Sequence, residues 1–224
     1  MNHPSWIGAI RAVLFDFDGV IADTETRHFA TFVEVLAEEG IALGPGENAE
    51  TYMGIEDRRA FEIAFERAAR PLSTELRDEL SERKSALYRT SAPDIAIFPG
   101  ARELIESASS RGPVTIASGG RRRDIEVVLS RNGLLDHFPS FVSGDDIEHS
   151  KPDPDAFLLG LDLLRREAAP DLEAASCLVF EDSFRGVQAA KRAGMRCVAI
   201  THSCPARRLR EADLVIDSLL DWRW

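Results

Sequence analysis

A short apolar segment that runs directly into two acidic residues limits the folds open to this chain. Ala12 to Phe15 are apolar, and Asp16 and Asp18 follow at once, before Gly19. A continuous apolar run of this length, ended by a polar turn, predicts a strand that is buried on both faces. Alternate residues of an extended chain point the same way, so both carboxylates should face one crevice at the carboxyl end of the strand. Open parallel sheets bind their ligands at that end.

Two carboxylates in one crevice repel each other. At an effective dielectric constant near 20, a close pair costs roughly 4 kcal/mol. A bound cation is therefore the simplest explanation for Asp16 and Asp18. The alternative is an ordinary turn at a strand end with solvated acids, because aspartate is common in turns. This segment by itself leaves both interpretations open.

The rest of the chain alternates between apolar runs and amphipathic segments, apart from three consecutive helical patterns after the first strand. This order predicts an α/β fold, a doubly wound, Rossmann-like parallel sheet with helices inserted after its first strand. We expect a core domain of residues 1–23 and 96–224 and a small helical domain of residues 24–95. The expected strands are 12–15, 113–117, 141–142, 176–180, 196–200 and 213–216, and the expected helices are 25–39, 57–69, 72–89, 101–111, 121–132, 154–168 and 184–193.

The charge and the cysteines exclude several classes of function. The formal net charge is −11, which disfavours a broad surface for nucleic acid or for an anionic membrane. There is no pattern of a signal peptide or of a membrane span, so a cytoplasmic location is expected. Cys177, Cys197 and Cys204 are odd in number and lack metal-type spacing, which predicts reduced thiols. We expect a monomer or a weak homodimer.

A second apolar run ends in Ser118, Gly119 and Gly120, just before a predicted helix. A serine hydroxyl can donate to an anion, and glycines let backbone N–H groups approach it at the positive end of a helix. These residues therefore predict a phosphate site. An ordinary turn from strand to helix, capped by the serine, explains them equally well. Arg121 follows directly and could meet a distal anion of the substrate, although such an arginine commonly lies on a solvated helix face.

Lys151 is placed by the residues that follow it. Pro152 favours an extended conformation for the lysine, Asp153 is the expected N-cap of the next helix, and Pro154 suits its first position. An ammonium held beside carboxylates lowers their repulsion and can bind a phosphoryl oxygen. A surface lysine in a loop is the alternative.

The strand predicted over 176–180 repeats the pattern of the first strand. It delivers Glu181 and Asp182, followed by Ser183, to its carboxyl end. Mg²⁺ prefers oxygen ligands and needs only one or two direct carboxylates, so these acids and those of the first strand suit Mg²⁺. The alternative is a helix cap, a role that Ser183 could also fill.

Taken together, these motifs resemble those of the haloacid dehalogenase-like superfamily, whose members are mostly Mg²⁺-dependent phosphohydrolases. The run D-F-D-G-V-I-A-D-T-E resembles the first motif, Ser118 the second, K-P-D-P-D the third and Glu181-Asp182 the fourth. They occur in the family's order, although Ser150 stands where a glycine commonly precedes the lysine. The resemblance extends from Val13 to about Leu219, and the inserted helices are similar to the small cap of the β-phosphoglucomutase-like branch.

The resemblance implies a role for each candidate. Asp16 is the nucleophile that takes up the phosphoryl group, and Asp18 is the general acid and base. Ser118 and Lys151 bind phosphoryl oxygens. The implied Mg²⁺ ligands are Asp16, the backbone carbonyl of Asp18, and Asp182, with Glu181 as a ligand through water or as support. The implied substrate-binding residues are Ser118, Gly119, Lys151, His28, Arg58 and Arg121, with surface positions as the alternative for the last three.

The expected function is a Mg²⁺-dependent phosphatase that hydrolyses a small phosphorylated metabolite, such as a sugar phosphate, through an aspartyl phosphate on Asp16. Asp18 argues against dehalogenases, which lack an acid at that position. A sugar-phosphate mutase is the first alternative, but Asp57 stands where the mutase has an arginine and Met53 where it has a lysine. The second alternative is a phosphorylatable regulatory domain of the receiver type.

Overall fold

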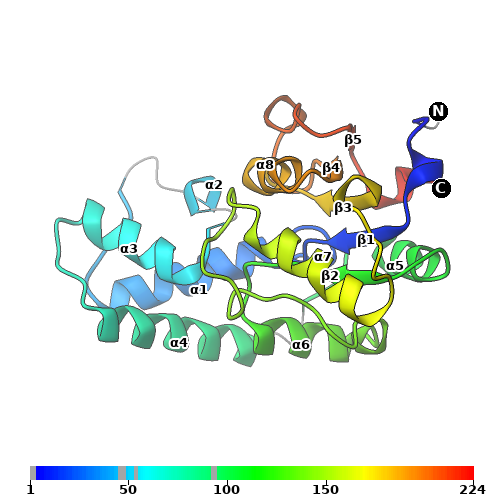
Figure 1. The fold of residues 1–224 in the computed structure, drawn as a ribbon. Coiled ribbons are helices and arrows are strands. Elements are labelled where there is room, and N and C mark those ends of the chain that lie inside the picture. Colours follow the sequence, from blue (N-terminus) through cyan, green and yellow to red (C-terminus); the bar gives the residue numbers. More distant parts are fainter. Residues whose placement is uncertain (1–3, 45–48, 53–54, 92–94) are drawn as a thin grey trace.

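The core of the molecule is a five-stranded parallel sheet, seen in a computed structural model that describes residues 4–44, 49–52, 55–91 and 95–224. The strand order is β2-β1-β3-β4-β5, and all four pairings are parallel (Figure 1). This confirms the predicted doubly wound fold. The strands are β1 (Ala12–Phe15), β2 (Val114–Ile116), β3 (Cys177–Glu181), β4 (Arg196–Ile200) and β5 (Leu214–Ile216).

The strand order places a crevice at the end of β1. The chain leaves β1 for β2 on one side and later crosses to β3 on the other side. The loops after neighbouring strands diverge at such a reversal of order, and open α/β sheets bind ligands there. Asp16 follows β1 and Glu181 ends β3, so the two predicted acidic pairs come from adjacent strands.

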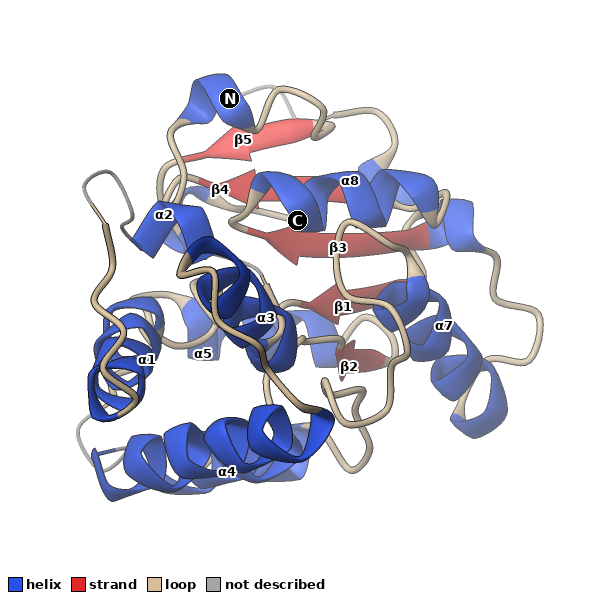
Figure 2. Cartoon of the chain, turned by 90° about the vertical axis from the view of Figure 1, so that its left-hand side faces the viewer, coloured by secondary structure: helices blue, strands red, loops and turns tan. Residues whose placement is uncertain are grey.

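Helices cover both faces of the sheet. Residues of α5 (Ala101–Ser109) and α6 (Arg122–Arg131) share a buried cluster with Val13, Phe15 and Phe180. Residues of α7 (Asp155–Glu167) and α8 (Phe184–Arg192) share a second cluster with Leu14 and Val179 (Figure 2). Successive residues of β1 therefore enter opposite clusters, which is why the strand is apolar throughout. Single 3₁₀ turns occur at Ile7–Ala9, Leu135–His137, Ala174–Ser176, Ala206–Arg208 and Leu219–Asp221.

Of the described helices between β1 and β2, the four that precede α5 form a separate group beyond the carboxyl ends of the strands, and we call them the cap. They are α1 (Glu25–Glu38), α2 (Ala49–Tyr52), α3 (Asp57–Arg67) and α4 (Thr74–Ser91). The apolar stripes of α1, α3 and α4 meet in a third buried cluster that includes Phe32, Phe61 and Leu80. The predicted bounds of the two domains stay a prediction.

The cap is tied to the core by a polar contact between α4 and α6. Ser85 Oγ lies 2.8 Å from both carboxylate oxygens of Asp124, and Arg89 Nη1 lies 3.2 Å from one of them. Burial raises the pKa of Asp124, although Ser85, His28 and Arg89 oppose that rise. The hydroxyl and the arginine thus satisfy a buried carboxylate at the boundary between cap and core.

Some local predictions were wrong. The predicted strand 141–142 is only a bridge from Val142 to Ala117, because Asp146 accepts from the N–H and hydroxyl of Ser143 and turns the chain. Helix α2 was missed, since four residues are too few for a periodic signal. Residues 53–54 and 92–94, which include Met53 and positions near the end of the predicted helical domain, lie outside the described residues. No helix of the described chain is long and apolar enough to cross a membrane.

Candidate active site

A cavity lies between the carboxyl ends of the strands and the cap, and most of the predicted site residues line it. The wall formed by the core contains the two acids after β1, the loop after β2, Lys151 and the residues after β3. The wall formed by the cap combines aromatic side chains with charged ones. The core wall consists of Asp16, Asp18, Gly119, Gly120, Ser150, Lys151, Asp182 and Ser183, and the cap wall of His28, Phe29, Phe32, Tyr52, Ile55, Glu56, Asp57, Ala60 and Lys84.

Lys151 joins the two acidic strand ends. Its Nζ lies 2.9 Å from Asp16 Oδ1 and 2.7 Å from Glu181 Oε1, and all three side chains are buried. Burial raises the pKa of Asp16 well above its usual range, although Lys151 opposes this effect. Burial by itself would raise the pKa of Glu181, but Lys151, the backbone N–H of Ser183 and a hydrogen bond with Asp16 outweigh burial and lower it. Both neighbouring carboxylates raise the pKa of Lys151, so the lysine keeps its charge at neutral pH.

Glu181 is held on all sides. Its Oε2 accepts from the backbone N–H groups of Asp182 at 2.8 Å and Ser183 at 2.7 Å, while Oε1 accepts from Lys151. A Cβ atom at Gly186 would lie 1.5 Å from Oε1, so α8 needs a glycine at that point. Both oxygens of Glu181 are therefore occupied, which favours the predicted role as support over that of a direct metal ligand.

The chemistry of the acidic cluster fits a divalent cation. Ligand atoms of Asp16, Glu181 and Asp182 lie within 4.8 Å of one another. The ammonium of Lys151 pairs with two of these carboxylates, those of Asp16 and Glu181, and one positive charge does not balance three carboxylates. Oxygen ligands and a surplus of carboxylates suit Mg²⁺. Gly19, at φ +77°, makes room for Asp182, since a Cβ atom there would lie 1.8 Å from Asp182 Oδ2.

Replacing Gly19 by alanine should therefore weaken cation binding. The methyl group would displace the carboxylate of Asp182, and we expect at least about a tenfold higher Mg²⁺ concentration at half-maximal activity. Calorimetric titration with Mn²⁺ gives the same comparison without turnover. Gly133→Ala is the control, because Gly133 also has a positive φ, +61°, but has no atom within 4 Å of its Cβ position. Equal cation affinity in the two variants would contradict the assignment of Asp182.

Asp18 forms its own set of contacts. Its Oδ1 accepts from Thr24 Oγ1 at 2.5 Å and lies 3.1 Å from His28 Nε2, while Ser118 Oγ lies 3.5 Å from its Oδ2. Burial by itself would raise the pKa of Asp18, but His28, Thr24 and Lys84 outweigh burial and lower it to about 2. Asp18 is thus a carboxylate at neutral pH before substrate arrives.

His28 links Asp18 to the cap. Its ring stacks on Tyr88 with 4.2 Å between centroids, and its Nδ1 lies 2.9 Å from Lys84 Nζ. An ammonium can only donate, so Nδ1 is the acceptor and Nε2 carries the hydrogen that faces Asp18. Lys84 also forms an ion pair with Asp57. His28 thus contacts Asp18, and the contacts continue through two further cap residues, Lys84 and Asp57.

Replacing His28 by phenylalanine should raise the pKa of Asp18 above about 2. Phenylalanine keeps the stacking on Tyr88 and removes both nitrogens, so burial is less opposed. In the wild type the depressed pKa contributes roughly 2 kcal/mol of stability above pH 4, which is lost as the pH falls toward 2. Carbon-13 NMR titration of the aspartate carboxyl groups measures the shift, with Asp213 as an internal reference. A pKa of Asp18 that stays near 2 would refute this role of His28.

The loop after β2 presents backbone groups to the cavity. Gly119 and Gly120 line the cavity, whereas Ser118 is buried and its Oγ accepts from the N–H of Gly120 at 2.9 Å. Gly144 packs against this loop and donates to the carbonyl of Gly120 at 2.7 Å. Direct contact of Ser118 with a phosphoryl oxygen stays a prediction, and the structure adds a role for its hydroxyl in shaping the turn.

Arg58 and Arg121 do not line the cavity. Arg58 Nε lies 3.1 Å from Asp78, and Arg121 forms an ion pair with Glu82 on α4. Their predicted contact with the substrate stays a prediction that requires these ion pairs to open.

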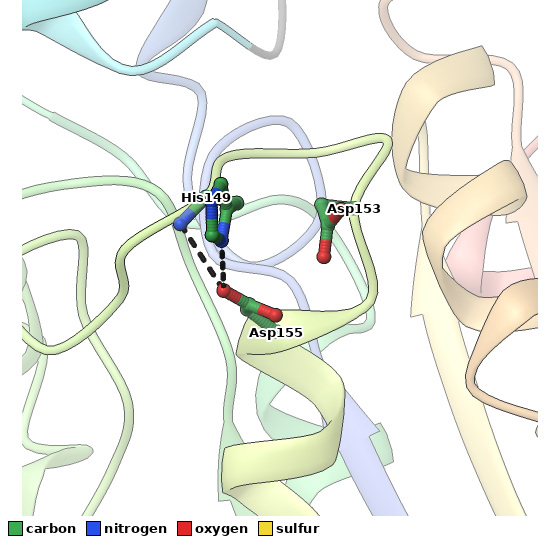
Figure 3. A group of neighbouring side chains, drawn as sticks. All are labelled: His149, Asp153 and Asp155. Carbon is green, nitrogen blue, oxygen red and sulfur yellow. Dashed lines mark hydrogen bonds and ion pairs between the residues drawn. The ribbon is translucent and has the colours of Figure 1, made fainter.

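A hydrogen-bonded loop carries Lys151 into the site. Asp155 Oδ2 accepts from the backbone N–H of His149 at 3.1 Å and lies 3.0 Å from its Nδ1, and Asp153 lies beside this pair (Figure 3). The prediction that Asp153 caps the next helix was wrong. Helix α7 begins at Asp155, and this side chain instead ties the start of the helix back to His149. The loop that holds Lys151 is thereby closed.

Sequence reasoning missed several residues of the site. It did not single out Thr24 or Lys84, and it did not place Asp57 in the cavity. These residues lie in or next to helical segments rich in polar residues, where the hydrophobic period does not show which polar side chain is functional. Gly144 and Gly186 were missed because they have no side chain, and their role is to leave room for neighbouring atoms of the site. The one available signal was the spacing of Thr24 within the first motif.

Comparison with known proteins matches most of this chain to one enzyme family. A family model described as haloacid dehalogenase-like hydrolase matches residues 13–200. A phosphorylated carbohydrates phosphatase of Thermotoga maritima is 32% identical over 200 residues, which cover 87% of this chain and 87% of the relative. The β-phosphoglucomutase of Bacillus subtilis is 28% identical over 217 residues, which cover 95% of this chain and 91% of the relative.

Among solved structures, the crystal structure of β-phosphoglucomutase from Clostridium difficile superposes with a TM-score of 0.84. The two chains are 24% identical, and the superposition covers 96% of this chain and 94% of the other. This similarity shows a shared fold.

Proposed function

The chain belongs to the haloacid dehalogenase-like hydrolases and is a phosphohydrolase, and from this premise we propose a Mg²⁺-dependent phosphatase that acts through an aspartyl phosphate on Asp16. We propose a small phosphorylated metabolite, such as a sugar phosphate, as its substrate. One observation carries the proposal. Asp16 and Asp18 follow β1, Lys151 precedes α7 and Asp182 follows β3, and all four residues line a single cavity. A relative named for phosphorylated carbohydrates supports the substrate class.

In the first step a carboxylate oxygen of Asp16 attacks phosphorus. An O–P bond forms to Asp16, the bond from phosphorus to the leaving oxygen breaks, and its electron pair goes to that oxygen. Lys151, 2.9 Å from Asp16, balances negative charge on the phosphoryl oxygens. In this proposal the backbone N–H of Gly119, a residue that lines the cavity, binds the same oxygens.

Asp18 supplies a proton to the leaving oxygen. Its pKa of about 2 describes the cavity without substrate. A phosphate dianion beside Asp18 disfavours a second negative charge, so substrate binding raises this pKa and favours the protonated acid. In the second step the Asp18 carboxylate takes a proton from water, the water oxygen attacks phosphorus, and the bond to Asp16 breaks to release phosphate.

The residues that would hold Mg²⁺ are Asp16, Asp182 and the backbone carbonyl of Asp18, with Glu181 and Lys151 as support. When bound, the cation draws negative charge from the phosphoryl oxygens and so favours attack by a carboxylate.

A sugar-phosphate mutase is the second candidate, supported by the similarity to β-phosphoglucomutase over 95% of the chain. The cap wall gives it little support. Asp57 and Glu56 line that wall, and a mutase must hold a second phosphate there. The receiver-type alternative does not accord with membership of an enzyme family.

The test is phosphate release from a panel of phosphorylated metabolites, with Mg²⁺ and with EDTA. We expect release that EDTA stops and added Mg²⁺ restores. Incubation with glucose 1-phosphate, followed by assay of glucose 6-phosphate, distinguishes a mutase. Undiminished release in EDTA would rule out dependence on a divalent cation, and isomerisation that outpaces hydrolysis would favour the mutase.

A further inference from the structure

The cap wall of the cavity differs in charge from the core wall. Phe29, Phe32 and Tyr52 present aromatic rings, and Glu56, Asp57 and Lys84 are the carboxylates and the ammonium on that wall. If phosphate binds at Asp16 on the core wall, as the proposed function requires, the leaving group must lie against this cap wall. The residues of the cap wall therefore determine which leaving groups can bind.

The positive charge of Lys84 is already compensated. Its side chain is only 5% exposed, and its Nζ forms an ion pair with Asp57 Oδ1 and a hydrogen bond to His28 Nδ1 at 2.9 Å. Two of the three N–H bonds of the ammonium thus point at residues of the protein. The carboxylate of Asp57 neutralises this ammonium, so the pair of Lys84 and Asp57 adds no net positive charge to the cap wall.

Glu56 adds negative charge to the same wall. It is the N-cap of α3, and its Oε2 accepts from the backbone N–H of Arg59 at 3.2 Å. Burial and, to a lesser degree, the charge of Asp57 raise the pKa of Glu56. This part of the cavity therefore already disfavours an additional negative charge.

The nearby arginines act on this charge only from outside the cavity lining, and the charge of Arg58 opposes the rise in the pKa of Glu56 without reversing it. Arg58 contacts Asp78 at 3.1 Å, Arg121 forms an ion pair with Glu82, and neither lines the cavity. Lys151 is held by Asp16 and Glu181 on the opposite wall. Among the described lining residues, no amino or guanidinium group on the cap side lacks a carboxylate partner.

We propose that Asp57 determines specificity: it occupies Lys84 and makes the cap wall negative, so the enzyme selects monophosphates whose leaving group is neutral and hydroxylated. Carbon–hydrogen faces of such a group pack on Phe29, Phe32 and Tyr52, and its hydroxyls donate to the carboxylate of Glu56. A leaving group with a second phosphate or a carboxylate would face two carboxylates. This inference extends the proposed function by naming the class of substrate.

The test compares two probes of the same length, sorbitol 6-phosphate and 6-phosphogluconate. They differ in a terminal hydroxymethyl group against a terminal carboxylate. We expect the wild type to prefer sorbitol 6-phosphate by about 100-fold in kcat/KM, because like charges would meet at the cap wall. In Asp57→Asn, Lys84 is free to bind the carboxylate, and we expect the ratio to fall at least about tenfold.

Three further variants sharpen the comparison. Asp57→Glu keeps the charge and should keep the preference. Glu66→Gln removes an exposed carboxylate of α3 outside the cavity lining and should leave the ratio unchanged. In the double variant Asp57→Asn/Lys84→Met, the freed cation is lost, and the preference should return toward the wild-type value. Each ratio is taken within one variant, so a partial loss of folded protein does not affect it.

Binding of the two probes to Asp16→Asn, measured by calorimetry with Mg²⁺, separates this inference from the proposed function. A preference for sorbitol 6-phosphate in binding, with no turnover in the wild type, would support the inference and refute the phosphatase. Equal affinity for the two probes, a ratio that does not change in Asp57→Asn, or no binding of sorbitol 6-phosphate would overturn the inference.

Discussion

Asp16→Asn is expected to lower phosphate release by a factor on the order of 10⁴ or more, because an amide oxygen cannot replace the carboxylate that forms the covalent intermediate. The fold should persist. Asparagine has the same shape, and the change removes one of three clustered carboxylates. Burial raises the pKa of Asp16, so a neutral side chain there costs the folded state little.

Activity is measured with the best substrate of the panel, and folding is measured by circular dichroism and urea unfolding. Asp171→Asn is the matched control, since Asp171 is exposed and pairs with Arg11 at 3.0 Å on the surface. Trapping with hydroxylamine should detect the aspartyl phosphate in the wild type and not in the variant. Activity above about a tenth of the wild type in Asp16→Asn would disprove the assignment of the nucleophile.

Lys151→Met should both abolish turnover and destabilise the protein. The change removes the ammonium that contacts Asp16 at 2.9 Å and Glu181 at 2.7 Å, in a site where these side chains are at most 10% exposed. Breaking a buried ion pair from one side typically costs about 3–5 kcal/mol, because the remaining charge is uncompensated. Methionine has a similar length, so little of this loss comes from a cavity.

The loss of stability should depend on pH with a defined sign. Lys151 helps to lower the pKa of Glu181 below its ordinary 4.5, so in the wild type this stabilising effect is present above that pH and is lost as the pH falls below it. Without Lys151, Asp16 and Glu181 take up protons more readily. The difference in unfolding free energy between wild type and variant should therefore be largest near pH 7 and should shrink toward pH 4.

Lys191→Met is the control for this comparison. Lys191 also forms an ion pair, at 2.6 Å to Asp213, but its side chain is 33% exposed. Pairs of that kind contribute about 0–1 kcal/mol. Urea unfolding of both variants at pH 7 and pH 4.5 measures the difference. If Lys151→Met lost no more stability than Lys191→Met, the buried network would not have the importance assigned to it here.

Much of the fold could be predicted because its signals are local. Strands β1, β3 and β4 are continuous apolar runs with both faces buried, and all seven predicted helices form with ends within two residues of those expected. The run 141–142 looked the same but lacked the length to continue past the turn at Ser143. Helix α7 begins at Asp155, one residue later than expected. The Asp155 carboxylate accepts a hydrogen bond from the backbone N–H of His149, and capping rules do not include a contact of this kind.

The sequence by itself determined the parallel sheet, the inserted helices and the acids at the ends of β1 and β3. The hydrophobic period of an element and the residue types that follow a strand depend only on residues close together in the chain. Only the tertiary structure decided the cap side of the cavity. His28, Asp57 and Lys84 are separated by up to 56 positions along the chain and contact one another through the packing of α1, α3 and α4. Their partners depend on how helices pack in space, and each helix alone shows a similar mixture of charges.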